Sequence, residues 1–288
     1  MDFTIVTPSY RQLDWLACCI ASVADQEGVT VEHIVQDAQT EGFAEFAEKM
    51  RQRWPDREGY RRVMISEPDN GMYDAVNKGL KRGSGRICAY LNCDEQYLPG
   101  ALRRVKNQVA ADPGPDLWVG DVIVVDSSGQ ALCQRKVLPP TRRHTWSCHL
   151  SALTAATFFR APVIESNFFF DPSYRAAADA EWFVRLLQAG KKIGRLGLVC
   201  STFVEGDRNL GLSPVALRER ERLDRSAPSW IRAFSWFWVL EHRARRWLWG
   251  CHKKSDTQYE IYLPAHPRRN SFAAPRLRTS WPNRLWQK

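Results

Sequence analysis

Short apolar runs and helical repeats alternate along the first 110 residues. Phe3 to Thr7 is an apolar, β-prone run, and an amphipathic helical repeat follows it. Further predicted strands lie at 29–36, 62–66 and 86–92, and predicted helices lie at 12–25, 43–54, 72–81 and 99–110. Strands that alternate with helices through short polar joints predict a mostly parallel, Rossmann-like α/β sheet with flanking helices.

The alternation stops after residue 110. Two strand-like runs, 118–125 and 131–137, flank the turn sequence Asp126-Ser127-Ser128-Gly129 and predict a hairpin. An amphipathic helix is predicted at 175–188 and a strand at 193–204. The second half of the sheet is therefore expected to be mixed, and the glycine-containing loop 205–211 after it is expected to be mobile.

Acidic residues follow the predicted strand 86–92. Ligands of parallel sheets bind beyond the carboxyl ends of the strands, where Asp94 and Glu95 lie. Carboxylate oxygens select Mg²⁺ or Mn²⁺, so these two residues are candidate metal ligands. The alternative is a solvated acidic turn that caps the next helix.

The segment 66–79 combines a turn with a helix. Asp74, Asn77 and Lys78 fall on one face near the start of the helix, where they could hold a nucleotide. Simple capping of the helix by Asp69 or Asn70 is the alternative.

Two further carboxylates, Asp179 and Glu181, lie in an otherwise apolar helix. A carboxylate buried near a cleft can act as general base for an acceptor hydroxyl. Alternatively, both are first-turn carboxylates favoured by the helix dipole. A P-loop and a dinucleotide fingerprint are both absent from the sequence, which argues against those two nucleotide-binding classes.

Taken in order, these segments resemble family 2 glycosyltransferases of the GT-A fold. The subgroup that they match carries TPSYNQ, EHIVxDGGSTDGT, SEPDxGxYDAxNKG, LNxDD and AxDYDxxLRLxxxG. The corresponding ranges here are 7–12, 32–42, 66–79, 91–95 and 177–190. The resemblance covers about residues 2–213 and implies that residues 1–213 form a nucleotide-sugar-dependent GT-A domain.

The resemblance also implies roles for individual residues. Asp37 would bind the base, Asp94 would be the metal-binding acid with Glu95 beside it, and Asp179 would be the catalytic base, with Glu181 as substitute. The remaining nucleotide- and sugar-binding positions are Thr7, Pro8, Tyr10, Asp69, Asp74, Asn77, Lys78 and Asn92. The family's Gly-Gly-x-Ser loop corresponds to 206–213.

The C-terminal quarter differs in composition from the rest. Residues 215–288 carry 16 Lys and Arg against 6 Asp and Glu, although the whole chain has a net charge of only +9. Trp230, Trp236, Trp238, Trp247 and Trp249 alternate with these cations. We therefore expect residues 214–288 to be a helical extension that meets an anionic membrane surface. The alternative is packing of these aromatic residues on the domain or a second subunit; nucleic-acid binding is not expected.

We expect the protein to lie in the cytoplasm, peripheral to the inner face of the membrane. It lacks a long apolar segment and a secretory signal, and its eight cysteines without a CxxC pair suit reduced, buried thiols.

The predicted function is an inverting, non-processive glycosyltransferase of polysaccharide or glycolipid biosynthesis. It would move a sugar from a nucleotide diphosphate sugar, a UDP-sugar being favoured, to a glycan or lipid-linked acceptor. The rivals are an inactive GT-A scaffold and a nucleotidyltransferase, although the latter's glycine-rich N-terminal signature is missing.

Overall fold

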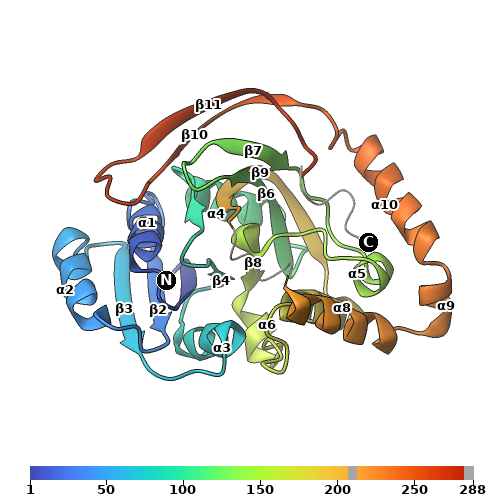
Figure 1. Cartoon of the computed structure of the whole chain (residues 1–288), viewed down its shortest axis with the longest axis horizontal. Helices are drawn as coiled ribbons and strands as arrows, with labels where there is room; N and C mark the ends of the chain where they lie inside the picture. Colours follow the sequence, from blue (N-terminus) through green and yellow to red (C-terminus); the bar gives the residue numbers. More distant parts are fainter. Residues whose placement is uncertain (207–212, 282–288) are drawn as a thin grey trace.

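A single curved sheet organises the protein in this computed structural model, which describes residues 1–206 and 213–281 (Figure 1). Its strands run in the order β3-β2-β1-β4-β8-β6-β9-β5, and β7 pairs with β6. The strands are β1 Phe3–Ser9, β2 Val31–Asp37, β3 Tyr60–Ser66, β4 Ile87–Tyr90, β5 Gln96–Tyr97, β6 Leu117–Val125, β7 Ala131–Arg135, β8 Thr157–Arg160 and β9 Ile193–Val204.

The first four strands in this order are parallel, as the alternating pattern predicts. β1 and β2 are buried along their whole length and pair from Phe3 opposite Val31 to Ser9 opposite Asp37. Because the strands are parallel, their carboxyl ends lie at one edge, and the polar residues that follow them are brought together there.

The other half of the sheet is mixed. β8 is antiparallel to both β4 and β6, while β6 and β9 are parallel. The predicted hairpin is present as β6 and β7, which are antiparallel across the turn at Asp126. The expectation of a mixed second half is therefore confirmed.

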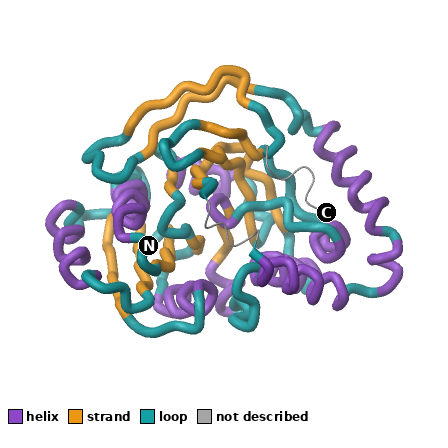
Figure 2. The backbone as a smooth tube through the Cα atoms, in the orientation of Figure 1, coloured by secondary structure: helices purple, strands orange, loops and turns teal. Residues whose placement is uncertain are grey.

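Helices lie around the sheet (Figure 2). α1 follows β1 and α3 follows β3, within one or two residues of the predicted bounds. The helices of the domain are α1 Leu13–Ala24, α2 Phe43–Arg53, α3 Met72–Arg82, α4 Ala101–Ala111, α5 Arg142–Ser147, α6 Ala161–Glu165 and α7 Ala178–Gln188, with a 3-10 turn at Thr154–Ala156.

The C-terminal extension contains three helices and a hairpin. Helices α8 Pro214–Ser226, α9 Ser229–Ala233 and α10 Ser235–Leu248 pass around one end of the sheet (Figure 1). Strands β10 Ser255–Ile261 and β11 Asn270–Leu277 then return across the domain as an antiparallel pair. The predicted helical extension is present, but the sequence reading missed this hairpin.

Polar contacts fasten the hairpin to the domain. The Gln96 side chain donates to the backbone oxygen of Tyr262 and accepts from its N–H, both at 2.8 Å. Arg269 makes a bidentate pair with Asp25, at 2.6 and 2.8 Å. Since bidentate, partly buried ion pairs are the stronger kind, Arg269 anchors the hairpin to a residue 244 positions earlier in the chain.

None of the eight cysteines, which all lie in the described residues, forms a disulfide, and all except Cys148 are buried. Among the described residues, no helix is both long and apolar enough to cross a bilayer.

Candidate active site

A cleft of about 2760 Å³ opens at the carboxyl ends of the parallel strands. The predicted site residues that line it are Pro8, Tyr10, Asp69, Asn92, Asp94, Glu95 and Asp179. Residues from α5, α7 and α8 form the opposite wall. The strand ends and the predicted base, which are far apart in the sequence, therefore face one space.

At the ends of β1 and β2, two buried oxygens have no hydrogen-bond partner among the described residues. These are Oγ of Ser9 and Oδ1 of Asp37, and their residues are paired across the two strands. The other oxygen of Asp37 accepts from the N–H of Thr40 at 2.7 Å and from the hydroxyl of Ser66 at 3.2 Å. An unsatisfied buried polar atom is costly, so each of these oxygens is suited to a polar ligand. Ser9 lines the cleft, whereas the predicted base-binding residue Asp37 is fully buried and does not line it.

A tight turn follows β4. The carboxylate of Glu95 accepts from the backbone N–H of Asn92 at 2.9 Å and from its side-chain amide at 3.1 Å. Burial and the negative charge of Asp94 raise the pKa of Glu95 to about 8. Both oxygens of Glu95 thus hold the turn, which leaves Asp94 as the acid that it presents to the cleft.

Asp94 fits a divalent metal ion better than Glu95 does. Its carboxylate is half-buried in the cleft wall, and no other described side chain is hydrogen-bonded to it. Burial raises the pKa of Asp94, because a charged carboxylate loses hydration there. The buried Oδ1 of Asn92 also lacks a partner in the described part of the chain, so two oxygen donors of the type that Mg²⁺ or Mn²⁺ prefers lie in this turn.

Helix α7 turns Asp179 and Glu181 in different directions. Asp179 lines the cleft, and burial raises its pKa. Glu181 pairs with Arg185 one turn later, at 2.6 Å. Two residues along a helix correspond to about 200°, so only one of the two carboxylates can face the cleft. Of the two, only Asp179 lines the cleft.

The segment 66–79 builds one wall of the cleft. Asp69 lines it and accepts from the N–H of Gly71 at 2.8 Å. Asp74 accepts from the N–H of Asn70 at 2.9 Å, and Lys78 donates to the carbonyl of Pro68 at 2.7 Å. Asp74 and Lys78, which also pair at 3.3 Å, therefore hold the loop in place from outside the cleft.

Two other predicted residues are also engaged with the protein. The amide of Asn77 donates to the carbonyl of Phe170 at 2.7 Å and accepts from its N–H at 3.0 Å. The hydroxyl of buried Thr7 lies 2.9 Å from Nε2 of His33. Neither lines the cleft, whereas Tyr10, 53% exposed, stands at its entrance under the guanidinium of Arg11.

The residues that form the cleft wall opposite the strand ends were not predicted from the sequence. They include Arg175, Arg220, His149 and Trp281. Nothing in the local sequence of these residues signals their place, because α8 and the C-terminal segment reach the cleft only through the fold. Most of the predicted Gly-Gly-x-Ser counterpart, residues 207–212, lies outside the described residues.

The N-terminal part of the chain, which carries the strand ends of the cleft, is similar to a known protein family. Residues 4–143 match the family model described as glycosyl transferase family 2. This match covers the parallel half of the sheet and the turn that carries Asp94, and it supports the predicted enzyme class, a glycosyltransferase.

Curated relatives share this N-terminal part. The succinoglycan biosynthesis protein ExoO of Rhizobium meliloti is 30% identical over 131 residues, which are 46% of this chain and 36% of that protein. A PGL/p-HBAD biosynthesis glycosyltransferase of Mycobacterium bovis is 27% identical over 42% of this chain and 47% of its own length. The chain therefore matches less than half the length of these relatives.

Solved structures share the fold over most of the chain. S. aureus TarS 1-349 in complex with UDP-GlcNAc has a TM-score of 0.61 at 14% identity, covering 86% of this chain and 73% of that one. The mannosyltransferase PcManGT from Pyrobaculum calidifontis, in complex with GDP-Man and Mn²⁺, has a TM-score of 0.52 at 16% identity, covering 84% and 75%. The prediction of a GT-A fold is confirmed.

Proposed function

We propose that this protein is an inverting, non-processive glycosyltransferase that uses a nucleotide diphosphate sugar. The observation that carries the proposal is the cleft that Asp94 and Asp179 both line, together with Ser9, whose buried hydroxyl has no partner among the described residues.

Each residue has a defined task in the proposed transfer. Asp37 and Ser9 would hold the base of the nucleotide, for which uridine is favoured by the subgroup resemblance of residues 66–79. A divalent ion, Mn²⁺ or Mg²⁺, held by Asp94 and Asn92 would offset the charge of the departing diphosphate. The loop at Asp69 would form the wall beside the sugar.

Asp179 would act as the base. It takes the proton of an acceptor hydroxyl while that oxygen bonds to the anomeric carbon, and the bond from that carbon to the diphosphate breaks. One displacement inverts the anomeric configuration. The raised pKa of Asp179 improves its match to a hydroxyl proton, while its contact with the N–H of Ala180 at 2.8 Å fixes the carboxylate.

The test is calorimetric titration of the purified chain with UDP, GDP and dTDP, each with and without Mn²⁺. We expect one nucleotide, UDP, to bind in a metal-dependent manner, and Asp94→Ala to lose that dependence. Asp112→Ala is the matched control, since this exposed aspartate follows α4 outside the cleft. If no nucleotide binds to the wild type with or without metal, the alternative hypothesis of an inactive GT-A scaffold replaces the proposal of an enzyme.

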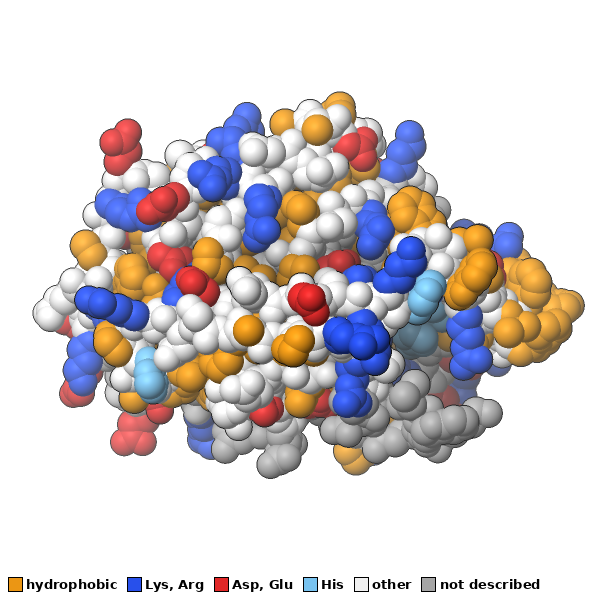
Figure 3. All heavy atoms as spheres, turned by 90° about the horizontal axis from the view of Figure 1, so that it is seen from above, with side chains coloured by type: hydrophobic (Ala, Val, Ile, Leu, Met, Phe, Trp, Pro, Cys, Tyr) orange, Lys and Arg blue, Asp and Glu red, His pale blue; other side chains and the backbone are white. Residues whose placement is uncertain are grey.

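The acceptor is proposed to be a glycan or lipid-linked hydroxyl compound presented at a membrane. The support is an exposed aromatic and aliphatic face on α9 and α10, which Figure 3 shows at one end of the molecule. Trp236 is 60%, Trp247 68% and Leu248 73% exposed. Arg232 and Arg243 are exposed on the same helices, a combination typical of interfacial helices on anionic lipid.

Not every aromatic residue of this segment is free for a membrane. Trp238 is buried, donates to the carbonyl of Ile231 at 3.0 Å and packs under Arg143.

Sedimentation with anionic and with neutral phospholipid vesicles tests the proposed contact between the exposed face of α9 and α10 and a membrane. We expect binding to the anionic vesicles that the combined Trp236→Ser and Trp247→Ser variant loses. Equal sedimentation of variant and wild type would contradict membrane contact through this face, and leave the transferase proposal untouched.

A further inference from the structure

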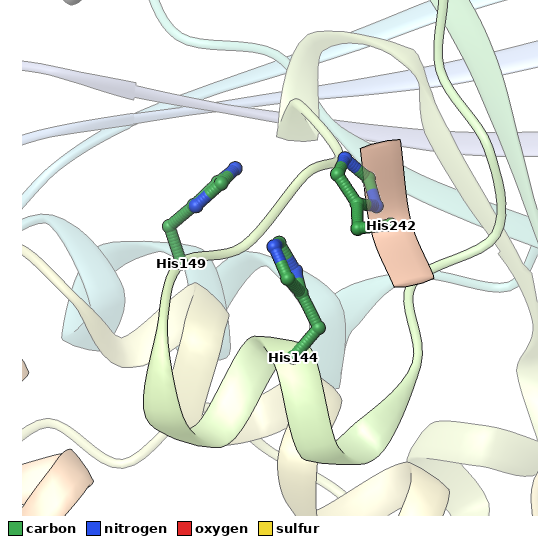
Figure 4. Close-up of side chains that lie close together, drawn as sticks. All are labelled: His144, His149 and His242. Atoms are coloured by element: carbon green, nitrogen blue, oxygen red, sulfur yellow. The ribbon is translucent and has the colours of Figure 1, made fainter. Parts of the chain in front are cut away.

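Three histidines meet beside the cleft, outside the residues assigned to the transfer. His144 lies on α5, His149 follows that helix, and His242 lies on α10 (Figure 4). One ring nitrogen from each lies within 4.8 Å of the other two. The first two come from the domain and the third from the extension, so the fold alone brings them together.

The central histidine lacks partners for both of its ring nitrogens. His144 is 1% exposed, and neither its Nδ1 nor its Nε2 has a hydrogen-bond partner in residues 1–206 and 213–281. A neutral imidazole carries one donor and one acceptor, and burying both unsatisfied is costly. The cluster thus contains polar atoms that a ligand could satisfy.

The buried histidines are held in the form that binds metals. Burial and the nearby charge of Arg245 lower the pKa of His144 to about 4. Burial and the two neighbouring histidines lower the pKa of His242 to about 3. Both are therefore neutral near pH 7, with a lone pair available for a metal ion.

We propose that His144, His149 and His242 bind one transition-metal ion of the Zn²⁺ type. Imidazole nitrogens suit Zn²⁺, whereas the oxygen donors of the turn at Asp94 suit Mg²⁺ or Mn²⁺. The two sites differ in donor chemistry, so one ion does not replace the other.

Binding requires a small closure of the three rings. Zinc–nitrogen bonds of about 2.1 Å place tetrahedral ligands roughly 3.4 Å apart, so the widest gap must shrink by about 1 to 1.5 Å. The rings of His144 and His242 are stacked at 4.2 Å with 18° between their planes, and one must turn about its Cβ–Cγ bond. His149 is exposed and can follow.

The site has an open side toward the cleft, which His149 lines. Three neutral imidazoles do not offset the 2+ charge of the ion. This charge would lie close to Arg245 and Arg246, whose charges also act on His242. This repulsion favours an anion, such as hydroxide or phosphate, as the fourth ligand. The bound ion would tie α10 to α5, and so connect the exposed aromatic face to the cleft wall.

The test is calorimetric titration of the metal-stripped full chain with ZnCl₂, beside His149→Ala and His266→Ala. Both histidines are exposed, but His266 lies in the turn between β10 and β11, away from the cluster. Wild type and His266→Ala should bind one ion per chain, and His149→Ala should bind at least about tenfold more weakly. Equal affinity in all three proteins overturns the proposal.

Cobalt gives a second readout that does not depend on transfer activity. Co²⁺ in a tetrahedral nitrogen site should give visible absorption bands in the wild type, and His242→Ala should lose them while its circular dichroism shows that it remains folded. Asp94→Ala should keep both the bands and the Zn²⁺ affinity. Loss of Zn²⁺ binding in Asp94→Ala would place the ion in the acidic turn and overturn the proposal.

Discussion

The carboxylate of Glu219 on α8 accepts a hydrogen bond from the backbone N–H of Ala177, the residue before α7, at 3.0 Å. It also accepts from the N–H groups of Arg175 at 2.6 Å and Ala176 at 2.8 Å. A nearly buried charge from the extension thus satisfies three consecutive donors next to the helix that carries Asp179. The extension therefore fixes the position of the proposed base.

Replacing Glu219 by Ala should lower both stability and transfer activity. Three partly buried N–H groups would lose a charged acceptor, at a cost of about 2 kcal/mol or more. Urea unfolding gives the first quantity and the rate of sugar transfer the second. The control is Glu48→Ala, because Glu48 on α2 is exposed, pairs with Arg51 one turn along and lies outside the cleft. Equal stability of the two variants would show that the contact has no such role.

Asp179→Asn should abolish transfer without weakening donor binding. An amide cannot take the acceptor proton, so the transfer rate should fall by a factor of about 10² to 10⁴. Glu181→Gln should retain most activity, since Glu181 pairs with Arg185 away from the cleft. Rates at saturating donor, together with nucleotide titrations, separate the two effects. If the transfer rate falls further in Glu181→Gln than in Asp179→Asn, Glu181 and not Asp179 is the catalytic base.

Asp2 should make stability depend on pH. Burial alone would raise its pKa, but hydrogen bonds from Lys106, from the N–H of Thr30 and from Arg86 outweigh it and hold the pKa well below the ordinary 3.8. Because the folded pKa is the lower one, the stabilisation is fully present above pH 3.8 and is lost as the pH falls below it.

The matching variant is Asp2→Asn. At pH 7 it should unfold about 1 kcal/mol more easily than the wild type, a modest effect because Arg86 is 79% exposed. The difference should shrink as the pH approaches the folded pKa. Urea unfolding at pH 7 and pH 3 measures it, and a difference that does not change between the two pH values would rule out Asp2 as the cause.

The parallel half of the fold could be predicted because local pattern determines it. β2 lies within the predicted run 29–36 apart from its last residue, and β3 ends at the same residue as the predicted run 62–66. The acids after β2 and β4 were found for the same reason, since strand ends can be read from periodicity. The identity of the residue that faces the cleft was harder: Asp179 and Glu181 differ only by their angle on α7.

The rest depends on contacts between distant segments. Glu219 reaches α7 from more than 40 residues away, and His242 meets His144 across α5 and α10. Strands β5 and β8 are two and four residues long, too short for a period to appear. The β10–β11 hairpin was missed because its strands contain few large apolar residues, so their alternation of buried and exposed positions does not appear as a hydrophobic pattern in the sequence.

Asp37→Asn should weaken nucleotide binding more than it weakens the fold. The amide side chain of Asn keeps one oxygen, which can still accept hydrogen bonds from Thr40 and Ser66. The loop after β2 therefore retains its contacts. The unpartnered Oδ1, however, becomes a donor and would face a donor of the base. Loss of one charge-assisted hydrogen bond corresponds to roughly 1.5 to 3 kcal/mol, or about ten- to a hundredfold in affinity.

Titration with UDP in the presence of Mn²⁺ measures this loss of affinity. The control is Ser66→Ala, which removes only a contact to the other oxygen of Asp37 and should bind UDP within about threefold of the wild type. Unchanged affinity in Asp37→Asn would mean that the base lies elsewhere in the cleft.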